Sequence, residues 1–461
     1  MDRSRGRGRR WTDWLPFGLI VMLLLAAAIG GGAAFADAPL VVIVRVAALI
    51  VIAVALVLMP GALWRRPTVP ILLFAALAAL IALQLMPLPP AIWTGLPGRS
   101  LIAAVATQVG FAQPWRPLTL TPMATWNSLI ACMVPLAAAI ATVWLGPRRQ
   151  LPLLVALIAL GLGSAMLGML QFVDASGGRF YLYQPADPGS AVGLFSNRNH
   201  QAAVLVCLLP LFAALAAELE AWRADLGWLA SIGATILGLA VVPLLLVTGS
   251  RSGLLLLPLG GVLAVAVGWP VLRRRLRVRA AQMVVAAGAV IGAALTAWFV
   301  HLNRAQSLAR LFATDVQAEQ RVELVAPLWQ MAMSYFPFGS GFGSFAAVYR
   351  IIEPDSQLNR TWLNHAHNDA LELLSDGGLV AVLLAGAALI WWGMRAVALW
   401  RQPATAEGVT LGRAGTAVSL IILLASLSDY PLRTPLVALI FAIVTCWIAV
   451  PSSRQSVPRQ E

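Results

Sequence analysis

The stretch LVVIVRVAALIVIAVALVLM, residues 40–59, contains one charged residue, Arg45, in twenty. A helix of about twenty apolar residues spans the hydrocarbon core of a membrane. Inside lipid every backbone N–H and C=O needs an internal partner, so such a run must be helical. Its unbroken apolarity also excludes the alternating pattern of an outer-membrane barrel strand. The stretch therefore predicts a membrane-spanning helix.

Segments of this kind recur along the whole chain. Of its 461 residues 60% are hydrophobic and only 11% are charged, which is too apolar for a water-soluble domain. Twelve membrane-spanning helices are expected near 17–36, 40–59, 69–87, 125–145, 152–172, 201–218, 229–248, 253–271, 281–300, 377–398, 414–428 and 436–451. The expected fold class is all-α, a polytopic integral membrane helical bundle.

The positively charged residues are concentrated in certain loops. The formal net charge is +13, and all 32 basic residues are arginines. Nucleic-acid binding is disfavoured because these arginines do not gather in one polar domain. Basic runs occur at 3–10, 64–66, 147–149, 273–279 and 394–402. The order of the segments places all of these runs on the same side of the membrane. The positive-inside rule makes those loops cytoplasmic and places both termini there.

Polar groups collect on the opposite side, in loops near 88–124, 173–200, 249–252, 301–376 and 429–435. All four histidines lie in or beside these loops, at His200, His301, His365 and His367. Loop 301–376 is long enough to form a small subdomain. Its PFGSGFGSF stretch (337–345) has glycines at alternate positions and predicts a tightly packed turn, not a nucleotide-binding loop.

Two short motifs carry arginines on this side. In FSNRNHQ (195–201), Asn197, Arg198 and His200 stand where a helix begins near residue 199, and helix N-terminal amides favour an anion such as phosphate. In TGSRSG, Arg251 violates the positive-inside trend, and its planar guanidinium can hold two phosphate oxygens. Contact with lipid headgroups is the alternative for both arginines.

The stretch NHAHNDALELL (364–374) is the densest in ionisable groups. If a helix begins with its first residue, His365, Asp369 and Glu372 share one face and His367 lies on a neighbouring face. An imidazole beside a carboxylate is a candidate general base. A His-Ala-His metal clamp and plain helix capping by Asn and Asp are the alternatives.

Two further stretches complete this side of the chain. QRVELVAPLWQMAM predicts an amphipathic helix, suited to the membrane interface, with Arg321 near its start. Its expected apolar face comprises Val322, Val325, Leu328, Trp329 and Met333. In SDYPLRTP an ion pair between Asp429 and Arg433 is expected to brace the last turn, in preference to substrate contact.

In order, these motifs resemble the O-antigen ligase family of bacterial membrane glycosyltransferases. The resemblance covers about 190–440: GLFSNRNHQAA, TGSRSGLL, RVELVAPLW followed by PFGSGFGSF, HAHNDALELLSDGGL and DYPLRTP. The most specific pattern is His-Asn, nine residues, then glycine, here His367-Asn368 and Gly378. Ala381 stands where the family often has a second small residue, usually glycine, and keeps the side chain small.

The resemblance implies a GT-C-like bundle in the bacterial inner membrane, surrounded by membrane lipids, with its active site facing the periplasm. It implies an undecaprenyl-diphosphate-linked glycan donor and an acceptor hydroxyl on lipid A-core or another glycan or lipid. It implies no cofactor and no metal, and the distribution of the arginines already argues against a nucleic-acid partner. The family pattern maps the catalytic histidine onto His367 and the phosphate-binding arginines onto Arg251 and Arg321, with inversion at the anomeric carbon. Substrate-binding positions are expected at Asn197, Arg198, His200, His365, Asn368, Asp369 and Glu372.

The expected organisation has a basic cytoplasmic N-terminus (1–16), an N-terminal transmembrane bundle (17–190) with periplasmic loop 88–124, a catalytic region (191–440) with loop 301–376, and a last helix end with a cytoplasmic tail (441–461). A polymerase of the same family, whose acceptor is another lipid-linked repeat, is the nearest alternative. A membrane transporter is the alternative of another class, and it would need ionisable groups near the middle of its spans.

Overall fold

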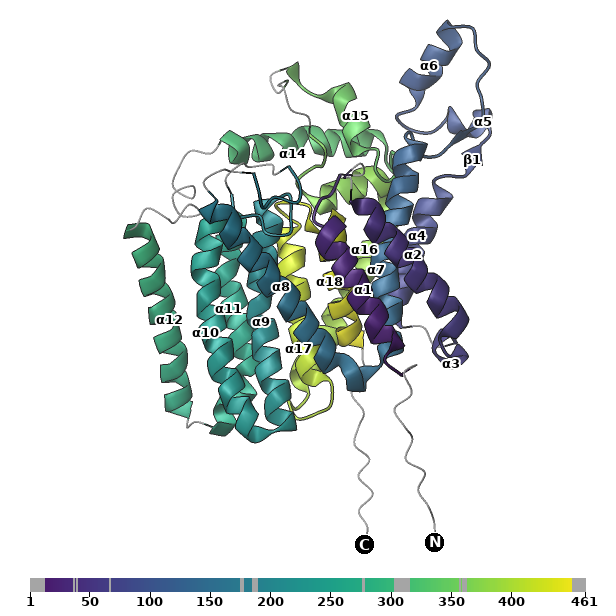
Figure 1. Ribbon diagram of the computed structural model, residues 1–461. Helices are drawn as coiled ribbons and strands as arrows, with labels where there is room; N and C mark the ends of the chain where they lie inside the picture. Colours follow the sequence, from purple (N-terminus) through teal and green to yellow (C-terminus); the bar gives the residue numbers. More distant parts are fainter. Residues whose placement is uncertain are drawn as a thin grey trace, which may run out of the picture.

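The computed structural model consists almost entirely of helices (Figure 1). It describes residues 13–35, 38, 40–65, 68–174, 178–184, 190–275, 278–301, 316–355, 358 and 363–449. Within these ranges some helical positions, including 299–301 and 316–323, are described by their backbone alone. The basic run 3–10, part of loop 301–376 and the C-terminal tail therefore lie outside the described residues.

Twelve helices coincide with the twelve expected segments. They are α1 (Leu15–Gly30), α2 (Val41–Leu58), α4 (Val69–Leu83), α7 (Pro122–Leu145), α8 (Gln150–Val173), α9 (Arg198–Trp222), α10 (Ala224–Thr248), α11 (Arg251–Arg275), α12 (Val278–His301), α16 (Asp369–Arg401), α17 (Val409–Ala425) and α18 (Pro435–Ala449). Within the described part of the chain, seven helices are long and apolar enough to cross a membrane, and five apolar helices are shorter. The prediction of an all-α polytopic membrane bundle is confirmed.

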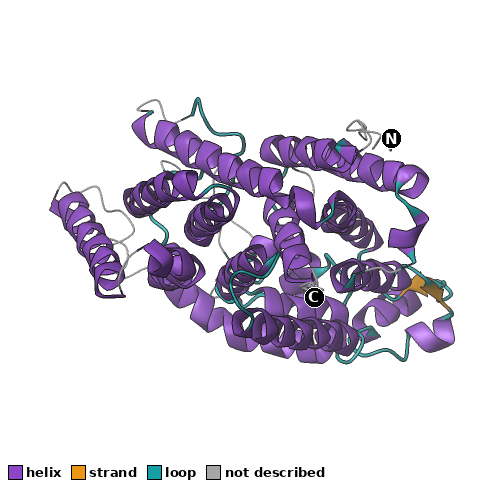
Figure 2. Cartoon of the chain, turned by 90° about the horizontal axis from the view of Figure 1, so that it is seen from below, coloured by secondary structure: helices purple, strands orange, loops and turns teal. Residues whose placement is uncertain are grey.

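Helix α9 forms the centre of the bundle. It packs against α8, α10, α11 and α17, and its side chains are buried on every face, as expected of a helix that is apolar all round. Seen from below, α12 stands at one edge of the bundle and the short strands lie at the opposite edge (Figure 2). The central position of α9 matters because its first turn contributes to the candidate site.

The expected outer loops gather at one end of the bundle, the upper end in Figure 1. There α14 (Val316–Ser334) and α15 (Phe345–Ile352) lie across the bundle. A cap rises beside them, made of α5 (Pro90–Trp93), α6 (Ser100–Gln108) and the paired strands β1 (Pro87–Leu88) and β2 (Arg116–Pro117). The short α3 (Gly61–Trp64) lies at the lower end.

The glycine-rich loop 337–345 packs backbone to backbone on a kink in α16. The helix leaves helical geometry at Gly378, which has φ 62° and ψ −153°. Gly341 N donates to Asp376 O at 2.9 Å, and a Cβ on Gly339 would lie 2.5 Å from the same carbonyl oxygen. The predicted tight-packing turn is confirmed.

The buried Arg99 ties the cap to this loop. Its guanidinium donates to the carbonyls of Pro97, Leu118 and Gly339 at 3.0, 2.7 and 3.0 Å and stacks over Tyr335. Burial lowers the pKa of Arg99 to about 10, despite the raising effect of Tyr335. The three carbonyls compensate for the lost hydration of the guanidinium.

The apolar face predicted for α14 was right for Leu328, which is buried, and wrong for three other residues. Val325, Trp329 and Met333 are exposed, and the side chain of Val322 lies outside the description. The buried face instead comprises Leu324, Leu328, Met331 and Ala332. It packs with Tyr335, Phe345 and Tyr349, so contact with α15 decides the orientation of the helix.

Gly339→Ala is expected to destabilise the protein by about 1–3 kcal/mol from backbone strain alone. Gly339 has φ 78°, and the added methyl group would press on the backbone of α16. Gly386→Ala is the matched control, because Gly386 lies within α16 and a Cβ added there would meet no other atom within 4 Å. Apparent melting temperatures of the two purified variants test this, and equal values would contradict it.

Candidate active site

Helix α16 begins after both histidines of NHAHNDALELL. Asn368 is its N-cap, and the Asn368 side-chain oxygen accepts from the amides of Ala370 and Leu371 at 3.0 and 3.1 Å. The helix therefore starts at Asp369, five residues after the predicted start at Asn364. The expected shared helical face of His365, Asp369 and Glu372 does not form, because the strong N-cap decides the boundary.

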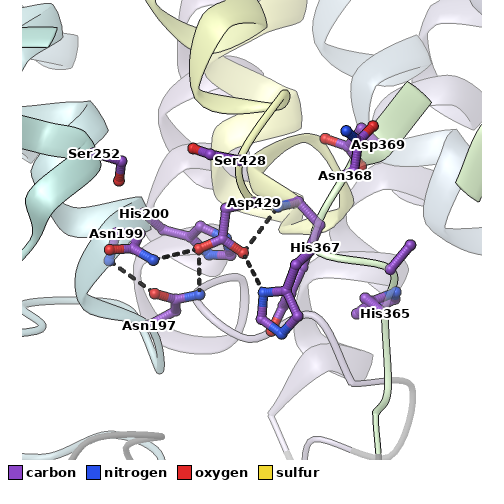
Figure 3. Close-up of polar contacts among 12 residues, drawn as sticks. Asn197, Asn199, His200, Ser252, His365, His367, Asn368, Asp369, Ser428 and Asp429 are labelled. Atoms are coloured by element: carbon purple, nitrogen blue, oxygen red, sulfur yellow. Dashed lines mark hydrogen bonds and ion pairs between the residues drawn. The ribbon is translucent and has the colours of Figure 1, made fainter. Parts of the chain in front are cut away.

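His367 is held against a buried carboxylate. Its φ of 49° lies in a region that residues other than glycine rarely adopt. Its Nδ1 lies 3.2 Å from Asp429 Oδ1 (Figure 3). The His367 side chain is 20% exposed and that of Asp429 only 2%. The imidazole is thus oriented from its buried side and accessible from the other.

Amide groups hold the Asp429 carboxylate in turn. Asn197 Nδ2 and Asn199 Nδ2 donate to Asp429 Oδ2 at 3.0 and 2.6 Å, and the Tyr430 amide donates to Oδ1 at 3.0 Å (Figure 3). A buried carboxylate needs such donors to offset its lost hydration. Burial, followed by the charge of Asp429, raises the pKa of the Tyr430 phenol, which therefore stays protonated.

The same asparagine, Asn199, reaches the TGSRSG turn. Asn199 Oδ1 accepts from Ser250 Oγ at 2.8 Å, and Ser250 Oγ accepts from the Gly253 amide at 3.1 Å. Arg251, the first residue of α11, follows Ser250 directly in this turn. The structure thus connects the surroundings of His367 with the turn of Arg251 through two side-chain hydrogen bonds.

Arg198 and His200 both lie buried in the first turn of α9, which begins at Arg198, close to the predicted start. His200 is 1% exposed and shares a hydrogen bond between its Nδ1 and Thr434 Oγ1 at 2.9 Å. Its Nε2 lies 3.9 Å from Asp429 Oδ1. The imidazole of His200 is thus buried against Asp429 and Thr434, and its predicted contact with a ligand stays a prediction.

His365 forms a second pair with a carboxylate. Its Nδ1 lies 2.8 Å from Glu372 Oε1, and Glu372 Oε2 accepts from the Ala366 amide at 2.8 Å. The rings of His365 and His367 lie 4.5 and 4.9 Å from the Tyr430 ring. The expected proximity of His365 and Glu372 is therefore found, although the loop before α16 brings it about.

Arg433 pairs with three carboxylates of α16. Its Nη1 lies 3.0 Å from Glu372 Oε1 and 3.5 Å from Asp376 Oδ2, and its Nε lies 3.4 Å from Asp369 Oδ1. The predicted ion pair with Asp429 was wrong, because the 3-10 turn Pro431–Arg433 carries Arg433 towards α16. Burial opposes the charge of Arg433, but Glu372, Asp376 and Asp369 outweigh it and raise its pKa.

Arg321 is part of α14, where only its backbone is described and its side chain is not. The side chain of His301, at the end of α12, is outside them too. The part of the chain that the structure describes contains no group of three or more His, Cys, Asp or Glu arranged to hold a metal ion. The chemistry visible at this end consists of paired imidazoles, carboxylates and arginines.

Sequence reasoning missed Asp429 as the partner of His367, and Asn199 and Ser250 as the link to the arginine turn. They come from three segments between residues 199 and 429 of the chain, and local spacing gives no sign that they meet. One signal was available. Asp429 is an acid in a short outer loop where neighbouring loops provide His, Asn and Ser as hydrogen-bonding partners.

Comparison with known proteins assigns this region. Residues 233–386 match the family model described as O-antigen ligase. This domain belongs to the O-antigen ligase family. No curated protein matches the chain. The matched range includes Arg251, the glycine-rich loop and both histidines that precede α16, whereas Asn199 and Asp429 lie outside it.

The family domain gives the protein a coarse role. It is a multi-pass membrane protein with a glycosyltransferase-like ligase domain, of the type that acts as ligase or polymerase in polysaccharide assembly. Lipid-linked glycans and their acceptors are the substrates that this family implies.

Arg433→Gln is expected to destabilise the protein by about 3–5 kcal/mol, because it leaves two buried carboxylates, Glu372 and Asp376, and the partly buried Asp369 without their cation. Arg149→Gln is the control. It breaks the Arg149–Asp13 pair, whose side chains are 35% and 47% exposed, and should cost within about 1 kcal/mol. Thermal unfolding of both purified variants in detergent measures the difference, and a similar small effect for both would rule out the stabilising role of Arg433.

Proposed function

We propose that this protein uses its O-antigen ligase domain to transfer a glycan from an undecaprenyl-diphosphate-linked donor to an acceptor hydroxyl on the periplasmic face of the bacterial inner membrane. The observation that carries the proposal is the His367–Asp429 pair, at 3.2 Å, connected by hydrogen bonds to the turn of Arg251. This arrangement combines a candidate base with a candidate diphosphate site at the same end of a membrane bundle.

His367 is the proposed general base. With Nδ1 directed at Asp429, the opposite nitrogen, Nε2, is the one that takes the proton from the attacking hydroxyl. The Asp429 carboxylate fixes the ring and stabilises the imidazolium that forms, as in other catalytic His–carboxylate pairs. General-base catalysis of this kind contributes about 10²- to 10⁴-fold in rate.

The arginines stabilise the leaving group, undecaprenyl diphosphate. As the acceptor oxygen bonds to the anomeric carbon, the bond from that carbon to the diphosphate oxygen breaks and undecaprenyl diphosphate departs. Attack from the side opposite the diphosphate inverts the anomeric carbon. Arg251 and Arg321, with Arg198, neutralise the developing negative charge, so the proposed reaction needs no metal ion.

Other residues around this pair divide into two proposed groups. Asn197 and His200 act through Asp429, since both side chains are directed to that carboxylate and are buried. The second group comprises the ion pairs of Arg433 with Asp369 and Glu372, and the pair of Glu372 with His365. Asn368 caps α16. Arg198 is as buried as Asn197, at 8% exposed, so we expect His365, whose side chain is 15% exposed, to lie nearer the substrate than Arg198.

Two acceptors fit this chemistry. A ligase transfers the glycan to lipid A-core or to another glycan or lipid, and a polymerase transfers it to another lipid-linked repeat. Both reactions use the same donor and the same base. Lipopolysaccharide from a strain lacking the gene separates them, because unattached polymer indicates a ligase and a single capped repeat indicates a polymerase.

The arrangement of charge favours transferase chemistry over ion-coupled transport. The acids of α16 are Asp369, Glu372 and Asp376, all in its first turns and all paired with Arg433 at the upper end of the bundle. Ion-coupled transporters place such groups near the middle of the membrane. The ionisable groups here lie where a membrane-anchored donor would present its diphosphate.

His367→Gln and Arg251→Gln are each expected to lower glycan transfer at least about 100-fold, the former by removing the base and the latter by removing charge from the leaving-group site. Arg251→Lys should recover only part of the activity, because lysine lacks the planar fork. Arg350→Gln, on the exposed face of α15, is the charge-matched control and should remain near the parental rate.

The measurement uses the full chain in lipid nanodiscs with a synthetic undecaprenyl-diphosphate-linked sugar, rough lipopolysaccharide as acceptor probe, and EDTA throughout. Parental transfer in EDTA supports the metal-free mechanism, and its loss would overturn that part. Transfer by His367→Gln at more than half the parental rate would overturn the assignment of the base.

Cysteine labelling tests the proposed sidedness. The native Cys132, Cys207 and Cys446 are buried, so single added cysteines report on their own positions. Gln108→Cys, on the exposed part of the cap, should react with a membrane-impermeant maleimide in intact cells. Glu407→Cys, in the exposed turn between α16 and α17, should react only after lysis. The reverse labelling pattern would place the site in the cytoplasm.

A further inference from the structure

We propose that Asn199 is a positioning residue that couples the general base to the arginine turn. The inference rests on the function proposed above. It adds how the general base and the arginine turn are held in a fixed position relative to each other. Asn199 holds Asp429 with its amide nitrogen and Ser250 with its amide oxygen, at 2.6 and 2.8 Å. Its side chain therefore connects the carboxylate partner of the base directly to the turn of Arg251.

The chemistry of the site fixes the orientation of the Asn199 amide. A carboxylate only accepts hydrogen bonds, so the NH₂ group of Asn199 must face Asp429. Its oxygen then faces Ser250, whose hydroxyl donates to it. An aspartate, serine or alanine at position 199 could not make both contacts with the same geometry.

Asn197 provides an internal comparison. It also donates to Asp429 Oδ2, at 3.0 Å, but its oxygen caps α9 by accepting from the Asn199 amide at 2.8 Å. Asn197 therefore supports the carboxylate without touching the arginine turn. Of the two asparagines, Asn199 alone joins the described contacts of Asp429 to those of the turn.

Ser250 transmits position within the turn. It is fully buried, its amide donates to Thr248 Oγ1 at 3.1 Å, and its hydroxyl accepts from the Gly253 amide at 3.1 Å. Ser250 is thus fixed to the ends of both α10 and α11, and Arg251 follows it directly. A shift of this turn when diphosphate binds is passed through Ser250 and Asn199 to Asp429, and from there to His367.

The coupling predicts a particular pattern of rates. Asn199→Ala and Ser250→Ala should each lower kcat about tenfold, the usual scale for losing a hydrogen bond to or near a charged group. The double variant should be no slower than about the slower single variant, because both substitutions break the same connection. The Kd for undecaprenyl diphosphate in nanodiscs should change less than about threefold, since the arginine charges remain.

A pH profile separates positioning from a merely structural role. Asn199→Asp keeps the shape of the side chain but puts a second carboxylate beside Asp429, which favours the protonated form of the base. The acid limb of the rate profile should therefore move to higher pH in Asn199→Asp and not in Asn199→Ala. Asn127→Ala, which loses a hydrogen bond with Arg45, and Ser334→Ala, on the exposed face of α14, are matched controls.

The decisive comparison is between the single and double variants. Losses that multiply, to about 100-fold in the double variant, would overturn the coupling, and so would an unmoved acid limb in Asn199→Asp. These results are separable from failure of the proposed function. If His367→Gln is inactive and Asn199→Ala transfers glycan at the parental rate, only the coupling is refuted. If His367→Gln is active, the proposed function is refuted, whatever the rate of Asn199→Ala.

Discussion

The arrangement of the upper end depends on one buried negative charge, that of Asp429. Its carboxylate is 2% exposed, so it must be surrounded by donors, and those donors come from the first turn of α9, from its own turn and from His367. Satisfying this group brings together segments that are far apart in the sequence. The position of the histidine, with its unusual φ, follows from the position of the carboxylate.

A second buried group of charges fixes α16 relative to the last outer turn. Arg433 meets Asp369, Glu372 and Asp376, and Glu372 also holds His365. The same stretch of α16 receives the glycine-rich loop at its kink, where Gly343 N donates to Asp376 Oδ2 at 3.1 Å. Charge pairing and close backbone packing thus act on the same two turns of helix, and both keep the loop before α16 in place.

Sequence reasoning predicted the bundle well and the site only in part. Unbroken apolar runs leave the backbone no alternative to a helix in lipid, so all twelve segments coincide with helices, although the expected start of α16 at 377 lies eight residues after the observed one. The glycine-rich turn followed from its spacing, and the proximity of His365 and Glu372 was expected. The start of α16 differs from the predicted one because Asn368, and not Asn364, caps the helix. The partners of Asp429 and Arg433 were misassigned because tertiary contacts, not neighbours in sequence, satisfy buried charge.

The family domain covers residues 233–386, while Asn199 and Asp429 stand on either side of it along the chain. His367 therefore lies inside the matched range and its partner carboxylate lies outside it. A chimaera that exchanges only the matched region between two homologues would join one protein's imidazole to another's supporting asparagines and acid. A chimaera designed to transfer substrate specificity must therefore exchange the first turn of α9 and the last outer turn together with the domain.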